Sequence, residues 1–321
     1  MTSDLNSARV TSAPHAARVH AIGAGVCLVF WCSCTTTPNW DADDSITPPL
    51  PGETSLNKGA GRGDQIRVTL HLKSRQEIPV MVDTGSPDTM LDKSLNPQLG
   101  KRLGKEKFKF PAMRKGTAAS YKAPELYLGG TQLRIGKKVS TIDWNGGAAI
   151  LGMDCLQHYC IQLDFTAGKL RFLDPDHLKT EELGQAFPIT ISPWTGHVFV
   201  REDFMGAKRA KWMIDTGCNA DGALKRKLFK QALRAQHVSA AQAESNGAKG
   251  LGALFPETEF RGRYTNLIIG EMPPKEPFPN LIGLQFLARH LVTFNFPKGT
   301  MYLKRTSVGP LAVEGNSGNA R

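Results

Sequence analysis

An internal repeat constrains this 321-residue chain more than any other feature of its sequence. Two segments share a run of apolar residues followed by Asp-Thr-Gly, and their acids, Asp83 and Asp215, lie 132 positions apart (215 − 83). Further along, Ile150-Leu151-Gly152 matches Leu281-Ile282-Gly283 at an offset of 131 (283 − 152). A slip of only one residue between the two patterns indicates a duplicated unit rather than chance triplets.

The repeat divides the chain into segments of different composition. We expect a first unit over residues 65–178 and a second unit over residues 186–305, joined by a polar linker that contains Asp174-Pro175-Asp176. Residues 306–321 have no apolar periodicity, which predicts a disordered tail. Residues 35–64 are rich in Thr, Pro, Asp and Gly, which predicts a flexible tether.

Residues 1–34 have the features of a targeting segment. Basic residues precede a short uncharged run over residues 21–31, which is shorter than the roughly 20 apolar residues that a membrane span needs. We therefore expect export, as a periplasmic protein or a membrane-anchored lipoprotein with the lipid on Cys34. A disordered cytoplasmic tail is the alternative.

Composition excludes several classes of protein. The hydrophobic content of 40% and charged content of 21% are typical of a folded globular chain. The formal net charge of +11 would attract anionic partners, but Lys and Arg are not interleaved with aromatic residues, so we predict no nucleic-acid partner. No cysteine pair has zinc-site spacing, so we expect no metal and no cofactor, with Cys155 and Cys160 as buried thiols.

Each unit is predicted to be mostly β. Residues 66–72 alternate with period two, and residues 78–82 form an apolar strand that ends at Asp83. Residues 126–128 and 133–135 flank Gly129-Gly130, as the strands of a hairpin do. One short helix per unit is expected, over residues 151–159 in the first, and a strand pair follows it that turns at Gly168 or, in the second unit, at Gly299.

The two Asp-Thr-Gly segments suit the hydrolysis of a peptide bond by an activated water. Two carboxyl groups held close together do not both ionise readily, so one can take a proton from water while the other donates a proton to the carbonyl oxygen. We expect Thr84 and Thr216 to hydrogen-bond across a pseudo-twofold axis. Gly85 and Gly217 would allow close approach of the backbone.

The residue that follows each triplet differs between the units. Ser86 is expected to donate a hydroxyl hydrogen bond to Asp83, whereas the thiol of Cys218 is a weak donor. This difference predicts that Asp215 is the protonated partner. The other polar residues nearby are expected to have structural roles, as helix caps, salt bridges, or surface or hydrogen-bonded histidines: Asp88, Asp92, Asp221, His158 and His290.

On these motifs the chain resembles the retropepsin and pepsin clan of aspartic peptidases. Each lobe of that clan carries hydrophobic-hydrophobic-Asp-Thr/Ser-Gly and a later hydrophobic-hydrophobic-Gly motif behind the active-site loop, here with Leu151-Gly152 and Ile282-Gly283. The likeness covers residues 65–305. It implies an all-β fold of two closed, β-barrel-like lobes related by pseudo-twofold symmetry, and a single-chain retropepsin-like endopeptidase with Asp83 and Asp215 as its catalytic pair.

The resemblance also implies flaps that close over a substrate. Gly116-Thr117 and the glycines of residues 247–252, among them Gly247 and Gly250, are candidate hairpin tips, with ordinary surface turns as the alternative. Tyr121 is the nearest candidate for a flap tyrosine, and a core or surface role is the other interpretation. The expected partner is a peptide or protein in extended conformation. A monomer would suffice for activity. A second hypothesis is an exported peptide-binding protein that keeps the fold without turnover.

Overall fold

The computed structural model describes residues 49–109, 115–143, 149–204, 209–235, 240–245, 248–272 and 278–312. The predicted targeting segment with Cys34 and the flap candidate Gly247 lie outside these residues. No helix in the described ranges is long and apolar enough to cross a membrane.

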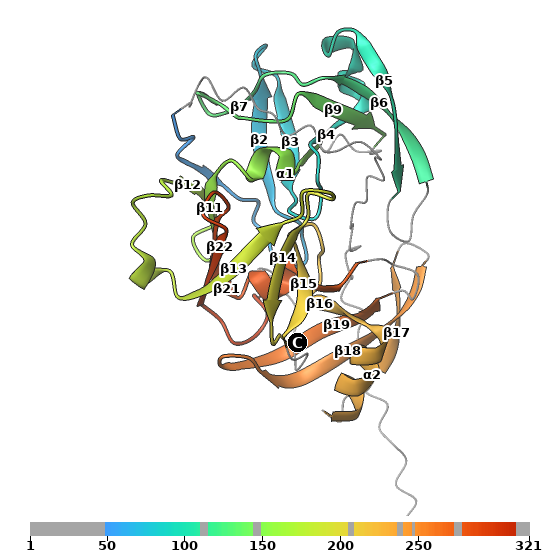
Figure 1. Ribbon diagram of the computed structural model, residues 1–321, viewed down its shortest axis with the longest axis vertical. Coiled ribbons are helices and arrows are strands. Elements are labelled where there is room, and N and C mark those ends of the chain that lie inside the picture. The colour runs from blue at the N-terminus through green and yellow to red at the C-terminus, as the bar shows by residue number, and fades with distance from the viewer. Residues whose placement is uncertain are drawn as a thin grey trace, which may run out of the picture.

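Most of the described chain forms β-strands in two large sheets (Figure 1). The nine-stranded sheet belongs to the first unit, and its spatial order is β5 (Arg102–Lys109), β6 (Lys115–Lys122), β9 (Lys138–Ile142), β4 (Met90–Asp92), β10 (Ala149–Leu151), β3 (Glu77–Val82), β2 (Arg67–Leu72), β7 (Leu126–Leu128) and β8 (Thr131–Gln132). The strands expected at 66–72 and 78–82 are β2 and β3. The hairpin expected at Gly129-Gly130 is β7–β8, whose second strand begins two residues earlier than expected.

The thirteen-stranded sheet draws on both units. Its order is β1 (Glu53–Ser55), β12 (Lys169–Leu173), β11 (Cys160–Asp164), β21 (His290–Asn295), β22 (Thr300–Arg305), β13 (Gln185–Ile191), β14 (Val198–Glu202), β15 (Ala210–Asp215), β20 (Asn280–Gly283), β16 (Gly222–Lys225), β19 (Arg263–Met272), β18 (Ala248–Glu259) and β17 (Ala240–Ser245). The predicted terminal hairpins β11–β12 and β21–β22 turn at Gly168 and Gly299, both with positive φ. Neither strand order demonstrates a closed barrel.

The register between β11 and β21 reveals the symmetry of the repeat. These strands are antiparallel and place Gln162 opposite Thr293, and the Gln162 Nε2 donates to Thr293 Oγ1 at 3.0 Å. The two residues are equivalent in the repeat, at the offset of 131 (293 − 162). Equivalent residues face one another only at a twofold axis, so a pseudo-twofold axis passes between the two units here.

The helices are short and differ between the units. α1 (Met153–Leu156) and α3 (Leu284–Leu287) follow the two hydrophobic-hydrophobic-Gly motifs, and η1 (Lys93–Gln98) and η2 (Thr180–Glu182) are single 3-10 segments. The expectation of one short helix per unit is wrong for the second unit, which also contains α2 (Arg226–Ala235). Helical spacing lets Phe229 bury fully while the basic residues face outward. In the first unit, η1 occupies the equivalent place and contains Pro97, which disfavours a longer helix.

Two segments predicted to be flexible are partly built into the fold. Residues 53–55 form β1, which satisfies the otherwise free edge of β12, and Leu56 and Ala60 are buried. In the expected tail, the Thr265 N–H donates to the Val308 carbonyl at 2.8 Å. The flexible assignments are therefore wrong for residues 53–64 and 306–308. Apolar burial and backbone pairing of these segments are long-range effects that their composition does not reveal.

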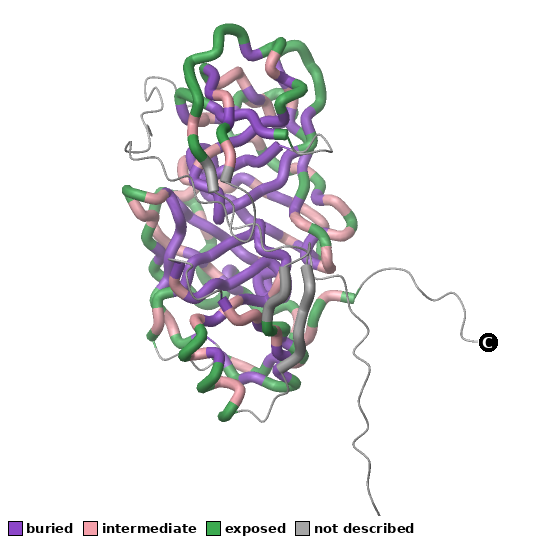
Figure 2. Tube along the Cα trace, turned by 90° about the vertical axis from the view of Figure 1, so that its right-hand side faces the viewer, coloured by how far each residue is buried: buried purple, intermediate pink, exposed green. Residues whose placement is uncertain are grey.

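One main apolar core extends through both units. Val82 and Ile214, which precede the two acids, belong to the same buried cluster. Figure 2 shows buried backbone running continuously through the middle of the molecule. The segments that carry Asp83 and Asp215 thus emerge from a shared, rigid core.

Candidate active site

Each acid lies at the end of a strand that pairs with the strand of a hydrophobic-hydrophobic-Gly motif. β3 and β10 run parallel with Val82 opposite Leu151, and the Asp83 N–H donates to the Leu151 carbonyl at 3.1 Å. In the second unit, β15 and β20 run parallel and place Asp215 opposite Gly283. The later motif therefore fixes the position at which each acid leaves its strand.

The glycines of these motifs allow the loop that follows each acid to lie directly against them. A Cβ on Gly152 would stand 2.4 Å from the carbonyl oxygen of Asp88, and a Cβ on Gly283 would stand 2.2 Å from that of Ala220. The following N–H groups, of Met153 and Leu284, donate to the carbonyls at positions 86 and 218 at 2.8 and 2.7 Å. Equivalent contacts in both units show that the repeat preserves the support of the loop.

The threonines join the two units by four hydrogen bonds. The Thr84 N–H donates to Thr216 Oγ1 at 3.0 Å, and the Thr216 N–H donates to Thr84 Oγ1 at 3.1 Å. Each hydroxyl then donates onward, Thr84 to the Ile214 carbonyl at 3.0 Å and Thr216 to the Val82 carbonyl at 2.8 Å. The bonds that the sequence predicts across the axis are present. They leave neither threonine with an unpaired buried donor.

The two carboxyl groups meet at the axis. A Cβ on Gly85 would lie 2.5 Å from Cγ of Asp215, and a Cβ on Gly217 would lie 2.5 Å from Oδ1 of Asp83. The two acids are close enough for the charge of Asp83 to raise the pKa of Asp215. Any side chain at either glycine would collide with the opposite carboxyl group, so glycine is required by space at both positions.

The two oxygens of each carboxyl group have different surroundings. Oδ1 of Asp83 accepts the Gly85 N–H at 2.8 Å, and Oδ1 of Asp215 accepts the N–H groups of Gly217 and Cys218 at 2.9 and 3.0 Å. Both Oδ2 atoms are buried and accept no donor from the residues that the structure describes. One oxygen of each acid is thus held by the backbone, while the other can share a proton or bind a water.

Burial makes ionisation of this pair costly. Loss of solvation raises the pKa of Asp83 to about 7, although backbone N–H groups, those of Gly85 and Gly217 among them, oppose the rise. Burial and then the charge of Asp83 raise the pKa of Asp215 well above its usual range. Two acids in contact titrate as a pair, and at intermediate pH the pair carries one proton.

Two side chains next to the pair differ from the sequence expectation. The Ser86 hydroxyl donates to the Asp88 carbonyl at 2.8 Å and not to the Asp83 carboxylate, so only its backbone N–H favours the anion. Cys218 is disulfide-bonded rather than a free thiol, and its contact with Asp215 comes from the backbone. The predicted contrast between hydroxyl and thiol donors therefore does not exist in this structure. Cys155 and Cys160 are buried free thiols, as predicted.

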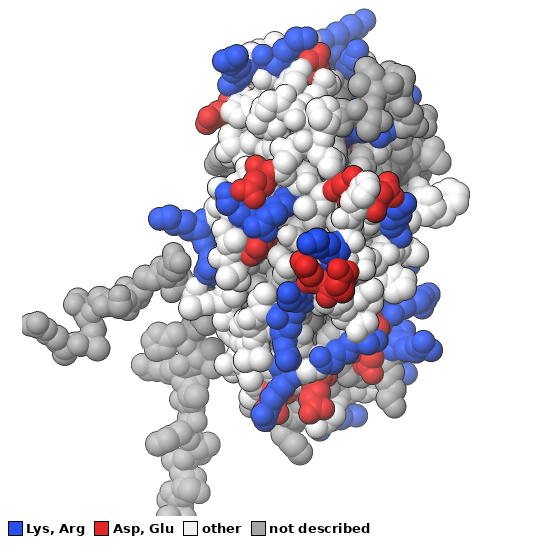
Figure 3. Space-filling view, turned by 90° about the vertical axis from the view of Figure 1, so that its left-hand side faces the viewer, with Lys and Arg blue, Asp and Glu red and all other residues white. Residues whose placement is uncertain are grey.

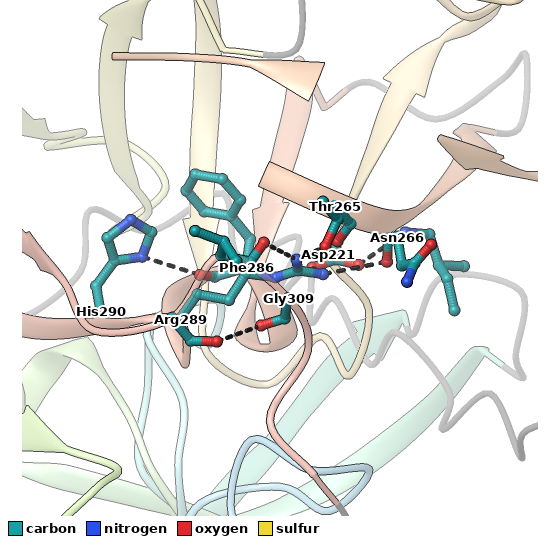
Figure 4. Close-up of polar contacts among 10 residues, drawn as sticks. Asp221, Thr265, Asn266, Phe286, Arg289, His290 and Gly309 are labelled. Carbon is teal, nitrogen blue, oxygen red and sulfur yellow. Dashed lines mark hydrogen bonds and ion pairs between the residues drawn. The ribbon is translucent and has the colours of Figure 1, made fainter. Parts of the chain in front are cut away.

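A buried ion pair supports the loop that follows Asp215. Asp221 Oδ1 accepts Arg289 Nη2 at 2.9 Å, and both side chains are fully buried (Figure 4). Arg289 also donates to the carbonyls of Thr265, Asn266 and Val308. The sequence predicts a structural role for Asp221, but Arg289 was missed. The sequence feature that could have indicated Arg289 is its position as the one arginine in the largely apolar run from Phe286 to Val292.

The remaining polar and aromatic candidates have structural positions. Asp92 caps η1 by accepting the Ser94 N–H, as expected for a helix cap. His290 is buried between the Tyr264 hydroxyl and the Phe286 carbonyl, and burial lowers its pKa to about 4. Tyr121 is buried in the main core rather than on a flap.

The flap candidates lie on or beside two hairpins, one from each unit. Gly116 on β6 pairs with Phe108 on β5, with Thr117 next to it, and Gly250 on β18 pairs with Ala243 on β17. Both hairpins lie on the right-hand side of Figure 1. Their connecting residues, 110–114 and 246–247, are outside the described part of the chain.

Charge is distributed unevenly over the surface. Figure 3 shows many Lys and Arg side chains along the upper end and the lower part of one face, and clusters of both acidic and basic side chains across its middle. Among the described residues, no group of three or more His, Cys, Asp or Glu is placed to hold a metal ion.

Comparison with known proteins supports the fold. No family model and no curated protein matches the chain. Its structure is similar to the crystal structure of basic 7S globulin from soybean, which has a pepsin-like fold, with a TM-score of 0.51 and 12% sequence identity. The match covers 81% of this chain and 96% of that chain. At this identity the likeness shows the fold alone, which is mostly β with two large sheets and few helices.

Proposed function

We propose that this chain is an aspartic endopeptidase that hydrolyses peptide bonds with a water activated between Asp83 and Asp215. The observation that carries the proposal is the pair of buried Oδ2 atoms, which have no partner among the described residues, on two neighbouring carboxyl groups. A structural role would not need two such groups, because burying acids without donors costs free energy that a folded protein normally avoids.

The proposed mechanism begins with one proton on the pair. The ionised Asp83 takes a proton from the bound water as the water oxygen attacks the substrate carbonyl carbon. Asp215, whose pKa is raised well above its usual range, donates its proton to the carbonyl oxygen. Collapse of the tetrahedral intermediate returns a proton to the pair and moves one to the leaving amine. Backbone N–H groups hold both carboxyl groups in place throughout, so no reorganisation is needed.

The proposal includes the finer architecture that the family resemblance implies. Each unit would close as a barrel-like lobe, with an extended peptide between the lobes and against the β5–β6 and β17–β18 hairpins. Both acids come from one polypeptide. A monomer would therefore suffice for activity, with export directed by residues 1–34.

The test uses the full chain and a mixed peptide library from pH 3 to 8. Wild type should cut, and Asp83→Asn or Asp215→Asn should each lower the rate by about 10²–10⁴-fold, the range for loss of a general acid or base. Asp176→Asn is the matched control, because Asp176 is exposed and pairs with Lys298 on the surface. Binding of peptides without cleavage at any pH would favour the peptide-binding hypothesis instead.

A further inference from the structure

The faces of the sheets that carry the two acids have their own apolar side chains. Side chains alternate along a strand, so Met81 shares a face with Asp83 and Met213 shares a face with Asp215. Each belongs to a small cluster separate from the main core, which we call the floor of its unit. The first-unit floor consists of Met81, Met90, Ala118, Ile142 and Ile150. The second-unit floor is Phe199, Met213, Cys218, Met272, Phe278 and Leu281.

The first-unit floor ends in polar side chains on the same face. Strand pairing places Ser140 opposite Met90 and Ser120 opposite Ser140. Glu106 lies opposite Ala118 and accepts the Ser140 hydroxyl at 2.7 Å. Ser120 is 3% exposed, and its hydroxyl has no partner among the described residues. A hydroxyl buried this deeply without a partner indicates a missing polar group.

A second carboxyl group completes this end of the floor. Asp88 lies five residues after Asp83 (88 − 83), and, like Glu106, it is partly exposed. Burial and the charges of Asp154 and Glu106 raise the pKa of Asp88 to about 7. In the described part of the chain, neither Asp88 nor Glu106 has a Lys or Arg partner. Lys122 and Lys138 lie further along this face, where both are exposed.

The second unit has no acid at the position equivalent to Asp88. Ala220 occupies the position equivalent to Asp88 at the repeat offset of 132 (220 − 88). Phe199 and Phe278 make the second-unit floor aromatic, and both rings contact His197. Lys211 lies over the Phe199 ring at 3.7 Å, so the charge beside this floor is positive. The two floors therefore offer different chemistry to the two sides of a bound substrate.

We propose that the polar end of the first-unit floor binds a Lys or Arg side chain of the substrate, with its cation between Asp88 and Glu106. Long basic side chains pack their methylene stems on apolar surface and extend the charge to its partners. Ser120 accepts a further hydrogen bond from the cation. This inference rests on the proposed peptidase function and names its substrate class.

The test compares matched peptides that carry Lys, norleucine or Gln at each position around the bond that wild type cuts. We expect the Lys peptide to exceed the norleucine peptide about tenfold in kcat/KM at one position, as for one hydrogen-bonded charge. Asp88→Asn or Glu106→Gln should reduce this ratio toward one. Glu125→Gln is the control, because Glu125 pairs with Lys73 on the surface, and its ratio should match wild type.

A binding assay separates this inference from the peptidase proposal. Fluorescence anisotropy of the same peptides on the Asp215→Asn chain should show the Lys preference, and Asp88→Asn in that background should remove it. Equal cleavage and equal binding of the Lys, norleucine and Gln peptides would overturn the acidic subsite and leave the peptidase standing. A Lys preference in binding without any cleavage by wild type would do the reverse.

Discussion

The two units hold Asp83 and Asp215 by similar backbone contacts but support them with different charges. At equivalent positions, the N–H groups of Gly136 and Ile268 each donate to a buried carboxylate, at 3.2 and 2.7 Å. In the first unit that carboxylate is Asp154, from α1. In the second unit it is Asp221, from the active-site loop. The two units therefore share the backbone N–H donor but use carboxylates from different positions of the repeat as its acceptor.

The consequence of the exchange is a difference in charge. Asp154 accepts the Thr89 hydroxyl at 2.7 Å, has no cation beside it among the described residues, and burial raises its pKa to about 6. Asp221 is paired with Arg289, which opposes the effect of burial on its pKa. The first unit thus uses an acid that can become neutral, and the second uses a fixed ion pair. Symmetry is required only where the two carboxyl groups of the dyad meet.

The largest effect on stability should come from breaking the ion pair of the second unit. Arg289→Met leaves Asp221 buried without its cation and removes donors from three carbonyls, so unfolding free energy should fall by about 3–5 kcal/mol. Urea unfolding at pH 7 measures it. Arg171→Met is the control, because Arg171 is a more exposed partner of Glu53 and Asp164 and should cost at most about 1 kcal/mol. A loss below about 1 kcal/mol for Arg289→Met would contradict the ion-pair assignment.

Substitution of the glycines at the axis should affect both units alike. Gly85→Ala and Gly217→Ala each place a methyl group 2.5 Å from the opposite carboxyl group, which should cost about 1–3 kcal/mol through overpacking. Cleavage should be lost in both variants, because the carboxyl groups are pushed apart. Gly129→Ala tests for a general glycine effect, since its positive φ causes strain but no atom stands within 4 Å of the added methyl group. Cleavage at the wild-type rate in either axis variant would mean that the carboxyl groups are not in contact.

The threonine bonds predict an equally symmetric effect on stability. Thr84→Val removes a donor to the Ile214 carbonyl and an acceptor for the Thr216 N–H, and Thr216→Val removes the equivalent pair. Each should cost about 1–3 kcal/mol, because the groups left behind are buried. Serine at either position should restore most of the stability. Unequal losses of thermal stability in the two valine variants would contradict the symmetric role of the two threonines.

A separate effect should be the pH dependence of stability that Asp154 contributes. Its pKa in the folded state, about 6, exceeds its ordinary value of 3.8, so the folded protein binds this proton more tightly than the unfolded chain. Stability from this group is therefore complete below pH 4 and is lost as pH rises through 6. Asp154→Asn should flatten the decline in unfolding free energy between pH 4 and 7. An unchanged slope would show that Asp154 is ionised across this range.

The sequence predicts much of the site because the residues that build it occur at equivalent positions in both copies of the repeat. Spacing locates both triplets, both supporting glycine motifs and the threonine bonds, since all of these depend on backbone position. The exchange of Asp154 for Asp221 and the donation of Ser86 to a carbonyl depend on side-chain rotamers and on distant partners, so no local pattern reveals them. The apolar spacing of Leu228, Phe229, Ala232 and Leu233 could have predicted α2.

A double-mutant cycle of the two acids tests the central claim most directly. Single-turnover cleavage by the Asp83→Asn, Asp215→Asn and double variants should show that the double variant is no slower than either single variant. Groups that act as one unit on one water lose their whole contribution when either is removed. If the fold-losses in rate of the two single variants multiply in the double variant, the two carboxyl groups do not work together. A single variant that retains the wild-type rate would show the same.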